Sequence, residues 1–455
     1  MRFPLKFFYQ DIEVGGESLR LYKLFLPLLI DQILRNLMTV ANVFMIGRYS
    51  DDMVASIGVA VQVATLGIMV LNALSIGGTV VITQNLGNKN RERAVGTAAL
   101  LIVMLSSISV ILGLSGAIFA PQIMTIMQLE EYVLSDGITY FRIIAFSGIL
   151  HGPLIALYAI SNSHGRPKNT MLTVMFLNLL NLLGNYIVIF RPFETPLEGA
   201  FGIAVVRAAS ELLALFLIIY LVSRMQLGIH FKSFVGKVRS ILKDILKIGI
   251  PSGIESFSIS FSQLIITGLV ATMGSIAVTT RIYVINIVLL VYIASIALGQ
   301  AAALIIGRLA GAGDFDGANR LNWNTLKLGV FINSTLALLV VIFRYQFMGF
   351  FTDNAEIINL GAGILIICFF AEVFRSINII QQQSLNATGD ARFKMIVTVC
   401  VLWLIGLPLA WLFSFQLGLG LYGFWVAFVI EEVLRGTSSM FRWKSGRWKS
   451  KRLTV

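Results

Sequence analysis

The chain repeats itself. GAFGIAVVRAASELL at residues 199–213 aligns without a gap with GLYGFWVAFVIEEVL at residues 420–434, which lie 221 positions further along. The identical pairs are Gly199/Gly420, Gly202/Gly423, Val205/Val426, Glu211/Glu432 and Leu213/Leu434. Apolar composition alone does not keep glycines and an acid in register, so the match indicates an internal duplication.

The duplication extends towards the N-terminus. Residues 27–165 align with the second half of the chain at a separation of 224 positions. The pairs that coincide include Pro27/Pro251, Asp31/Glu255, Asn162/Asn386 and Gly165/Gly389. The sequence therefore consists of two copies of one unit, joined by the segment 223–247.

The composition places the chain in a lipid bilayer. Its 455 residues are 57% hydrophobic and 13% charged, whereas soluble domains carry roughly 25% charged residues. Apolar runs of about 20 residues, long enough to cross a bilayer as helices, occur twelve times. The predicted spans are 24–47, 54–85, 94–119, 132–161, 169–190, 199–222, 248–273, 277–309, 318–344, 356–386, 394–415 and 419–441.

The fold class follows from the duplication and the spans together. Each copy contains six spans, and because six is an even number, the copies run in the same direction and are related by an axis along the membrane normal. The sequence predicts an all-α integral membrane protein whose twelve transmembrane helices form two six-helix lobes around a central cavity. This is the layout of a transporter.

The limits of the twelve spans divide the chain into four parts, and a short turn on the inner side follows the fourth span of each lobe. Gly165 and Gly389 are expected at positive φ in those turns. The parts are an N-terminal lobe (1–222), a cytoplasmic linker (223–247), a C-terminal lobe (248–441) and a basic cytoplasmic tail (442–455).

The net charge of +12 is distributed unevenly. Lys and Arg concentrate in the segments that face the cytoplasm if both termini lie inside, and such a bias sets the orientation of membrane proteins. We therefore expect both termini in the cytoplasm, in a bacterial plasma membrane. The basic clusters at 224–247 and 442–455 then face anionic inner-leaflet lipid, so their charge does not require nucleic acid as a partner.

Enzyme signatures are missing from the sequence. It contains no HExxH, GxSxG or GxxxxGK[ST] motif and no EF-hand loop, so we expect neither an enzyme nor a cofactor. Cys368 and Cys400 lie in apolar runs, which excludes a disulfide framework and a cysteine metal site. Without a nucleotide site, transport of a small molecule has to draw on an ion gradient, of H⁺ or Na⁺.

Ionisable residues inside spans are costly in lipid and are candidates for function. Four acids have an arginine three or four residues away on the same helix face. The pairs are Asp31 with Arg35, Glu211 with Arg207, Glu372 with Arg375, and Glu431 with Arg435. Each pair can stabilise the bundle or take part in function, and the sequence leaves both alternatives open.

Glu255 has no basic residue within one helical turn. It follows Pro251, which cannot donate a backbone hydrogen bond, so we expect the helix to be kinked or open there. An isolated buried carboxylate can exchange a proton. Glu255 is the first candidate for ion coupling, followed by its repeat mate Asp31 and by Glu372. The alternative is that an arginine of another span pairs with Glu255.

Several polar residues are candidates for lining the substrate cavity. Asn178, Asn181 and Asn185 recur at helical spacing along the fifth span, although interhelical hydrogen bonding is an alternative role for them. The full set of candidates is Arg35, Asn42, Asn178, Asn181, Asn185 and Arg375.

Five segments, in this order, resemble the multidrug and toxic compound extrusion (MATE) family of secondary transporters. They are ANVFMIGRYSDDMVASIGVA (41–60), TQNLGNKNRERA (83–94), NSHGRPKNTM (162–171), NLLGNYIVIF (181–190) and GLGLYGFWVAF (418–428). The resemblance implies export of amphipathic, usually cationic compounds in exchange for H⁺ or Na⁺. We expect the protein to act on a small-molecule substrate as a monomer.

The chain departs from the family pattern at its coupling residues. Many members have an Asp where this chain has Asn42, and some have an acid at Asn185; the acid of the seventh span would fall near Ile259, one turn after Glu255. A second hypothesis is therefore a lipid-linked oligosaccharide flippase of the same superfamily. It predicts that arginines remain free to meet pyrophosphate, namely Arg35, Arg142, Arg207 and Arg375.

Overall fold

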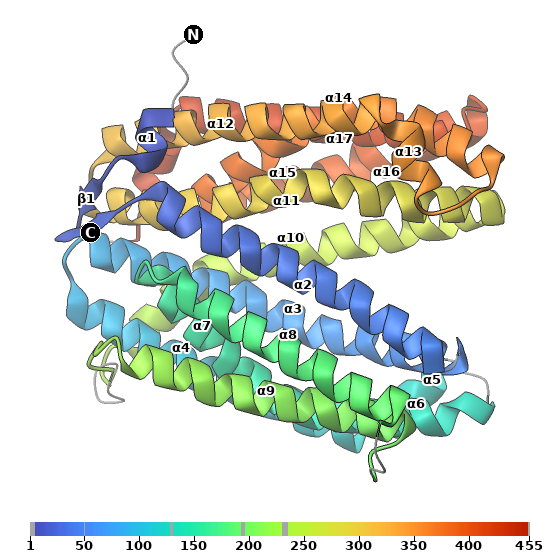
Figure 1. The fold of residues 1–455 in the computed structure, drawn as a ribbon. Coiled ribbons are helices and arrows are strands. Elements are labelled where there is room, and N and C mark those ends of the chain that lie inside the picture. The colour runs from blue at the N-terminus through green and yellow to red at the C-terminus, as the bar shows by residue number, and fades with distance from the viewer. Residues whose placement is uncertain (1–4, 50, 128–130, 193–195, 230–234, 454–455) are drawn as a thin grey trace. The chain divides into compact units, whose positions relative to one another are not determined.

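A computed structural model describes residues 5–49, 51–127, 131–192, 196–229 and 235–453. The described chain is almost entirely helical, with one short antiparallel hairpin of β1 (Ile12–Val14) and β2 (Glu17–Leu19) near its start (Figure 1). The helices of the first half are α1 (Leu5–Tyr9), α2 (Leu21–Tyr49), α3 (Asp51–Gly87), α4 (Arg91–Ile118), α5 (Ala120–Ile126), α6 (Glu131–Ser147), η1 (Gly148–Leu150), α7 (His151–Ser163), α8 (Pro167–Phe190) and α9 (Gly199–Ser223).

The second half repeats this series of long helices. They are α10 (Val238–Ala271), α11 (Ser275–Ala312), α12 (Phe315–Ile342), α13 (Arg344–Gly349), α14 (Ala355–Thr388), α15 (Ala391–Val401), η3 (Leu402–Gly406), α16 (Leu407–Trp411), η4 (Leu412–Gln416), α17 (Leu421–Lys444) and η5 (Arg447–Lys451). The segments η3 and η4 are π-helical and flank Pro408, which lacks the N–H that a regular helix needs. Together α15 to η4 form the eleventh span.

Eleven helical segments in the described part of the chain are long and apolar enough to cross a membrane. They correspond to the first eleven predicted spans. The twelfth, α17, carries Glu431, Glu432 and Arg435 within its apolar stretch, which lowers its mean hydropathy. The architecture of twelve helices in two copies is confirmed.

The boundary of the seventh span differs from the prediction. α10 begins at Val238 rather than at residue 248. Its first turns, VRSILKDILK, carry charges but also bury Ile241 and Ile245 completely. A search for continuous apolar runs misses such an amphipathic segment.

The chain divides into two compact units. Unit 1 comprises Met1–Leu29, Thr83–Lys89 and Ile250–Val455, and unit 2 comprises Ile30–Ile82 and Asn90–Gly249. Three of the four divisions therefore fall inside the long helices α2, α3 and α10, and the fourth falls between α3 and α4. The domain limits at 222 and 248 stay a prediction.

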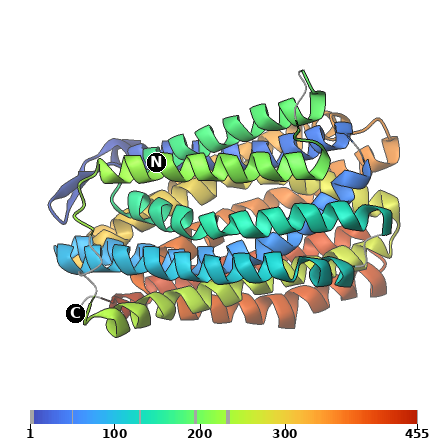
Figure 2. The same cartoon turned by 90° about the horizontal axis from the view of Figure 1, so that it is seen from below.

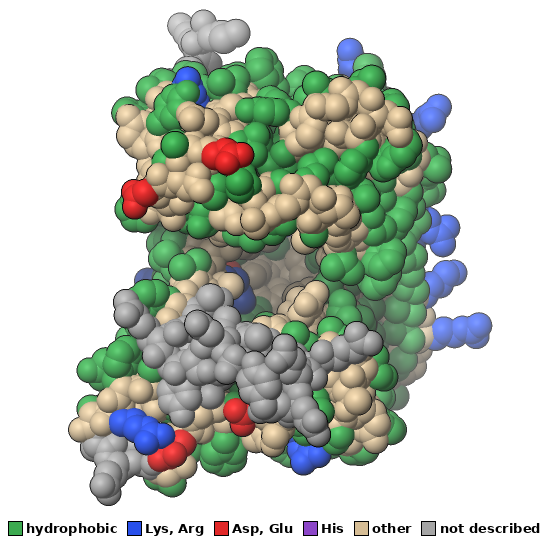
Figure 3. Space-filling view, turned by 90° about the vertical axis from the view of Figure 1, so that its right-hand side faces the viewer, with side chains coloured by type: hydrophobic (Ala, Val, Ile, Leu, Met, Phe, Trp, Pro, Cys, Tyr) green, Lys and Arg blue, Asp and Glu red, His purple; other side chains and the backbone are tan. Residues whose placement is uncertain are grey.

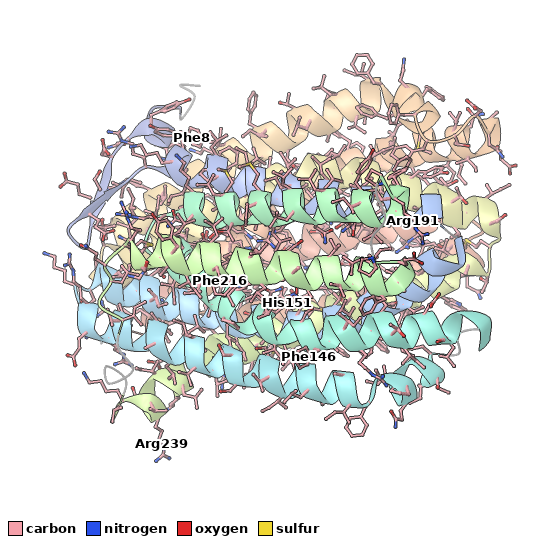
Figure 4. All side chains as sticks on the ribbon, turned by 60° about the horizontal axis from the view of Figure 1, so that its bottom comes forward. Phe8, Phe146, His151, Arg191, Phe216 and Arg239 are labelled. Carbon is pink, nitrogen blue, oxygen red and sulfur yellow. The ribbon has the colours of Figure 1, made fainter. Side chains whose placement is uncertain are left out.

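Unit 2 is packed through small residues, as membrane bundles commonly are. A Cβ atom at Gly152 of α7 would clash with the carbonyl oxygen of Leu105 on α4, so the two helices cross closely there. Figure 2 shows the helices of this unit running along a common direction. Phe146 and Phe216, labelled in Figure 4, are 60% and 59% exposed on its outer surface.

Unit 1 has two apolar cores. One involves Val284, Ile364 and Leu421 of α11, α14 and α17. The other joins α11, α12 and α14 to the hairpin and to the chain end. The turn glycines behave as predicted: Gly165, in unit 2, has φ +74° and Gly389, in unit 1, has φ +97°. Figure 3 looks onto one end of the helices, where hydrophobic side chains, a few acidic and basic ones and other atoms share the surface.

The basic tail packs against the protein. Trp443 and Trp448 are each 1% exposed, and their rings stack at 4.2 Å between centroids. The backbone N–H of Leu453 donates to Gln84 Oε1 at 2.8 Å, and Gln84 Nε2 donates to the carbonyl oxygen of Ala387 at 2.7 Å. The tryptophans fix the tail to unit 1, and the contact of its basic residues with anionic inner-leaflet lipid stays a prediction.

We predict that Trp448→Ala lowers the free energy of unfolding by about 3–5 kcal/mol, the usual cost of removing a buried Trp side chain. The matched control is Trp411→Ala, because Trp411 is 47% exposed. Thermal unfolding of the purified protein measures both variants. Equal losses for the two variants would contradict a structural role for the docked tail.

The hairpin is closed by a charged contact outside the membrane spans. Arg20 Nε and Nη2 each donate to one oxygen of Asp11 at 2.7 Å, and Ser18 Oγ donates to the same carboxylate at 2.6 Å. The hydrogen bonds from Arg20 and then Ser18 lower the pKa of Asp11 to about 2. This bidentate contact fixes the two ends of the hairpin to each other.

Because the pKa of Asp11 is lower in the folded protein, the contact stabilises the hairpin above the ordinary Asp pKa and is lost as the pH falls through about 2. We predict that Arg20→Met returns this pKa towards its ordinary value. Carbon-13 NMR of labelled Asp carboxyls measures it, with Asp11→Asn assigning the resonance. The exposed Arg239 gives the control variant Arg239→Met, which should leave the titration unchanged.

Candidate ion-coupling and substrate site

Asp31 and Arg35 form the predicted pair on α2. Arg35 Nε donates to Asp31 Oδ2 at 3.0 Å, and Asp31 is 6% exposed. Its other oxygen, Oδ1, is buried and accepts no hydrogen bond from the described residues. The Arg35 guanidinium lies 5.7 Å from the ring centroid of Tyr158 on α7. Among the described residues, Asp31 is thus hydrogen-bonded through only one of its two carboxylate oxygens.

The asparagines of α8 bond mainly to α2. Asn178 Nδ2 donates to the carbonyl oxygen of Leu34 at 3.1 Å. Asn185 Nδ2 donates to Asn42 Oδ1 at 3.2 Å and to Asn181 Oδ1 at 3.1 Å. Asn178 and Asn185 therefore form interhelical hydrogen bonds, the role that the sequence offered as the alternative to lining the substrate cavity. A second role towards substrate stays a prediction.

Glu211 of α9 is the centre of a buried polar cluster in unit 2. It accepts from Arg207 Nε at 3.1 Å, the predicted pair, and from Ser147 Oγ at 3.2 Å. His151 Nε2 lies 3.5 Å from the same carboxylate (Figure 4 labels His151). Ser147 and His151 were not predicted as partners, since helical spacing reveals contacts only within one helix.

Glu255 has a cation from another helix. Lys394 Nζ, on α15, lies 2.9 Å from Glu255 Oε2, and Thr398 Oγ1 of the same helix donates to Oε1 at 3.1 Å. The side chains of Glu255 and Lys394 are 4% and 11% exposed. The isolated carboxylate expected from the sequence is therefore a paired one, and its partner is a lysine rather than the arginine considered as the alternative. Helix α10 remains continuous through Pro251 and is not open there.

Glu372 of α14 is held from two sides. Arg375 Nη1 donates to Oε1 at 3.0 Å, and Asn333 Nδ2 of α12 donates to Oε2 at 3.2 Å. The Arg375 guanidinium stacks 3.5 Å from the ring centroid of Tyr292 on α11. Arg375 is thereby fixed against a carboxylate and an aromatic ring at once.

Glu431 and Glu432 of α17 both face Arg435. Arg435 Nη1 donates to Glu431 Oε1 at 2.7 Å and lies 3.7 Å from Glu432 Oε1. Asn378 Nδ2 of α14 donates to Glu432 Oε2 at 2.7 Å. The predicted pair of Glu431 with Arg435 is present, with a second carboxylate beside it.

Among the residues that the structure describes, the acidic side chains do not gather into a metal site. Within the described ranges, no group of three or more His, Cys, Asp or Glu side chains is placed to hold a metal ion. The two cysteines are free.

The comparisons agree with the motifs. Residues 27–187 and 251–412, one segment in each copy, match the MatE family model. The chain is 32% identical over 440 residues to an uncharacterised transporter of Bacillus subtilis, YisQ, covering 96% of each chain. It is 26% identical over 456 residues to a probable multidrug resistance protein NorM of Thermotoga maritima, covering 99% of this chain and 97% of that one.

Solved structures share the fold. A crystal structure of MATE in the bent conformation gives a TM-score of 0.87 at 19% identity, covering 94% of this chain and 95% of that chain. A mutant of the Vibrio cholerae MATE transporter VcmN gives 0.87 at 18% identity, covering 95% and 97%. Since the family model covers both copies and a relative above 30% identity spans nearly the whole sequence, the chain belongs to the MatE family of membrane transporters.

Proposed function

We propose that the chain is a secondary active antiporter that exports amphipathic, cationic small molecules in exchange for H⁺ or Na⁺ by alternating access. The observation that carries this proposal is the buried pair of Glu255 with Lys394, at 2.9 Å between α10 and α15. The NorM relatives, whose names describe multidrug resistance, support the substrate class.

A bound ion would replace Lys394 as the partner of Glu255. A proton on Glu255 would remove the charge that holds Lys394, whereas Na⁺ would take oxygen ligands from Glu255 and the Thr398 hydroxyl. Either ion changes which contacts are favourable. A coupling ligand acts by this differential interaction with two arrangements of the protein. Asp31, with its unbonded Oδ1, is the corresponding site in unit 2.

The chain ends support the proposed orientation in the cell membrane. Phe7 and Phe8, near the N-terminus, pack against the same core as Trp448, near the C-terminus. Both ends therefore lie at one end of unit 1, which agrees with two cytoplasmic termini. The basic residues of the tail at that end favour the inner leaflet.

The flippase hypothesis finds less support. Arg35, Arg207 and Arg375 each bind a carboxylate of their own helix, at 3.0 to 3.1 Å. An arginine whose charge is already neutralised gains less from a pyrophosphate. The pairing therefore favours the antiporter, in which acids and not arginines meet the exchanged ion.

We predict that Glu255→Gln abolishes gradient-driven efflux from proteoliposomes, because Gln neither binds a proton nor attracts Na⁺. Efflux of a dye and drug panel is measured under a pH gradient without Na⁺ and under a Na⁺ gradient at equal pH. Glu356→Gln is the matched control, since Glu356 is exposed at the start of α14. Undiminished efflux by the Glu255 variant would remove Glu255 from the coupling mechanism.

We also predict that Lys394→Met destabilises the protein by roughly 3–5 kcal/mol, the cost of leaving one partner of a buried pair unpaired. The double variant Glu255→Gln/Lys394→Met should recover most of that loss, because neither charge remains. Thermal or denaturant unfolding of the four proteins measures the coupling energy. Additive losses in the double variant would show that the two side chains do not interact.

A further inference from the structure

The buried charges between α14 and α17 do not balance. Three carboxylates, Glu372, Glu431 and Glu432, are 1%, 5% and 3% exposed. Two guanidiniums, Arg375 and Arg435, accompany them. All five side chains lie in unit 1, in a stretch (250–453) that the structure describes without a gap. One negative charge is left over.

Two of the three acids have an arginine of their own. Glu372 binds Arg375 at 3.0 Å, and Glu431 binds Arg435 at 2.7 Å. Glu432 reaches only the nitrogen that Glu431 already occupies, at 3.7 Å. Its shortest polar contact is the neutral amide of Asn378, at 2.7 Å. Glu432 therefore shares its cation, Arg435, with Glu431 and has no arginine of its own at hydrogen-bond distance.

The duplication shows what is missing. Glu211 is the repeat mate of Glu432, and Arg207 neutralises it from one turn before, at 3.1 Å. The position that matches Arg207 in the second copy is Phe428. The acid has been kept in both copies, but its arginine is present in only one.

Neighbouring helices do not supply the charge. Lys394 of α15 is engaged by Glu255 of α10, so this pair adds nothing to the balance. Arg375 lies 5.5 Å from the ring centroid of Phe428 but is bound to Glu372. The titratable and charged groups whose charges act on this cluster are Glu255, Tyr292, Glu372, Arg375, Lys394, Glu431 and Arg435. With Tyr292 neutral, the four carboxylates of Glu255, Glu372, Glu431 and Glu432 and the three cations sum to one negative charge. Such a charge is costly in an apolar interior.

The contact between Asn378 and Glu432 is compatible with a proton as the species that neutralises the Glu432 carboxylate. Asn378 is 2% exposed, and its Oδ1 has no hydrogen-bond partner. The oxygen and nitrogen of an amide exchange places by a half-turn, and their assignment follows from the hydrogen-bond network. A separation of 2.7 Å lies within the range of an O–H···O hydrogen bond and at the short end of the range of an N–H···O bond, so the distance is compatible with either donor. With a proton on Glu432 and the amide turned, Asn378 Oδ1 faces Glu432 Oε2 and accepts that proton, so the oxygen gains a partner.

We propose that Glu432 is a proton-binding site: its carboxyl group holds one proton on Oε2 and donates it to Asn378 Oδ1. The proton comes from water, forms the O–H bond of the carboxyl group, and returns to water when the cluster opens. A role for this proton in driving export rests on the proposed antiport function. The existence of the site does not, so the two can be tested separately.

Infrared spectroscopy of the full-length protein in liposomes tests the site directly. At pH 7 we expect the carbonyl stretch of one protonated carboxylic acid per molecule, shifted in D₂O and absent from Glu432→Gln. Glu372→Gln and Glu431→Gln are the matched controls and should keep it. No such band at pH 7, or a band that survives Glu432→Gln, would overturn the proposal.

Stability gives a second measurement with a distinct expectation. Gln resembles a protonated Glu, so Glu432→Gln should unfold within a few degrees of the wild type at pH 7. Glu372→Gln leaves the buried Arg375 without its carboxylate partner, so this variant should unfold at a clearly lower temperature than the wild type. Equal destabilisation of both would mean that Glu432 is an ionised partner of Arg435, which also overturns the proposal. The efflux test of Glu255→Gln is independent of both measurements. Whether or not that variant loses efflux, the infrared band and the unfolding temperature of Glu432→Gln keep the same meaning.

Discussion

The need to neutralise every ionisable group away from water governs this structure. Helices that face lipid cannot rely on solvent to stabilise a charge, so each buried acid has to find a cation or a proton. Asp31, Glu211 and Glu372 find an arginine on their own helix, whereas Glu255 reaches across to Lys394. The positions of these partners decide which helices are tied together and which can separate at low cost.

The sequence predicts contacts within a helix far better than contacts between helices. The spacing of three or four residues is sufficient for the pair of Asp31 with Arg35, because helical geometry alone brings those side chains together. No such rule links Glu255 to Lys394, which are 139 positions apart by their numbers. Lys394 stands at the start of the eleventh span, and only the packing of α15 against α10 reveals its role.

The fold was predictable for a similar reason. A duplication with six apolar runs in each copy defines both the number of helices and their direction, and the structure contains them. The ends of the chain were not predictable from the same signals. Basic residues dominate the composition of 442–455, yet Trp443 and Trp448 determine where the tail lies. Two large apolar side chains outweigh several solvated charges, because the charged heads still reach water while the rings are buried.

The prolines connect the charge pairs to the division of the chain. Pro27 and Pro251 are repeat mates, and the divisions at Leu29/Ile30 and Gly249/Ile250 lie within three residues of them. Each proline removes one hydrogen bond from a long helix, so the backbone is least constrained near these points. Asp31 and Glu255 each follow their proline by one turn. A change in the charge of Asp31 or Glu255 therefore acts at the part of the helix that is easiest to deform. A small electrostatic change has its largest structural effect at such a point.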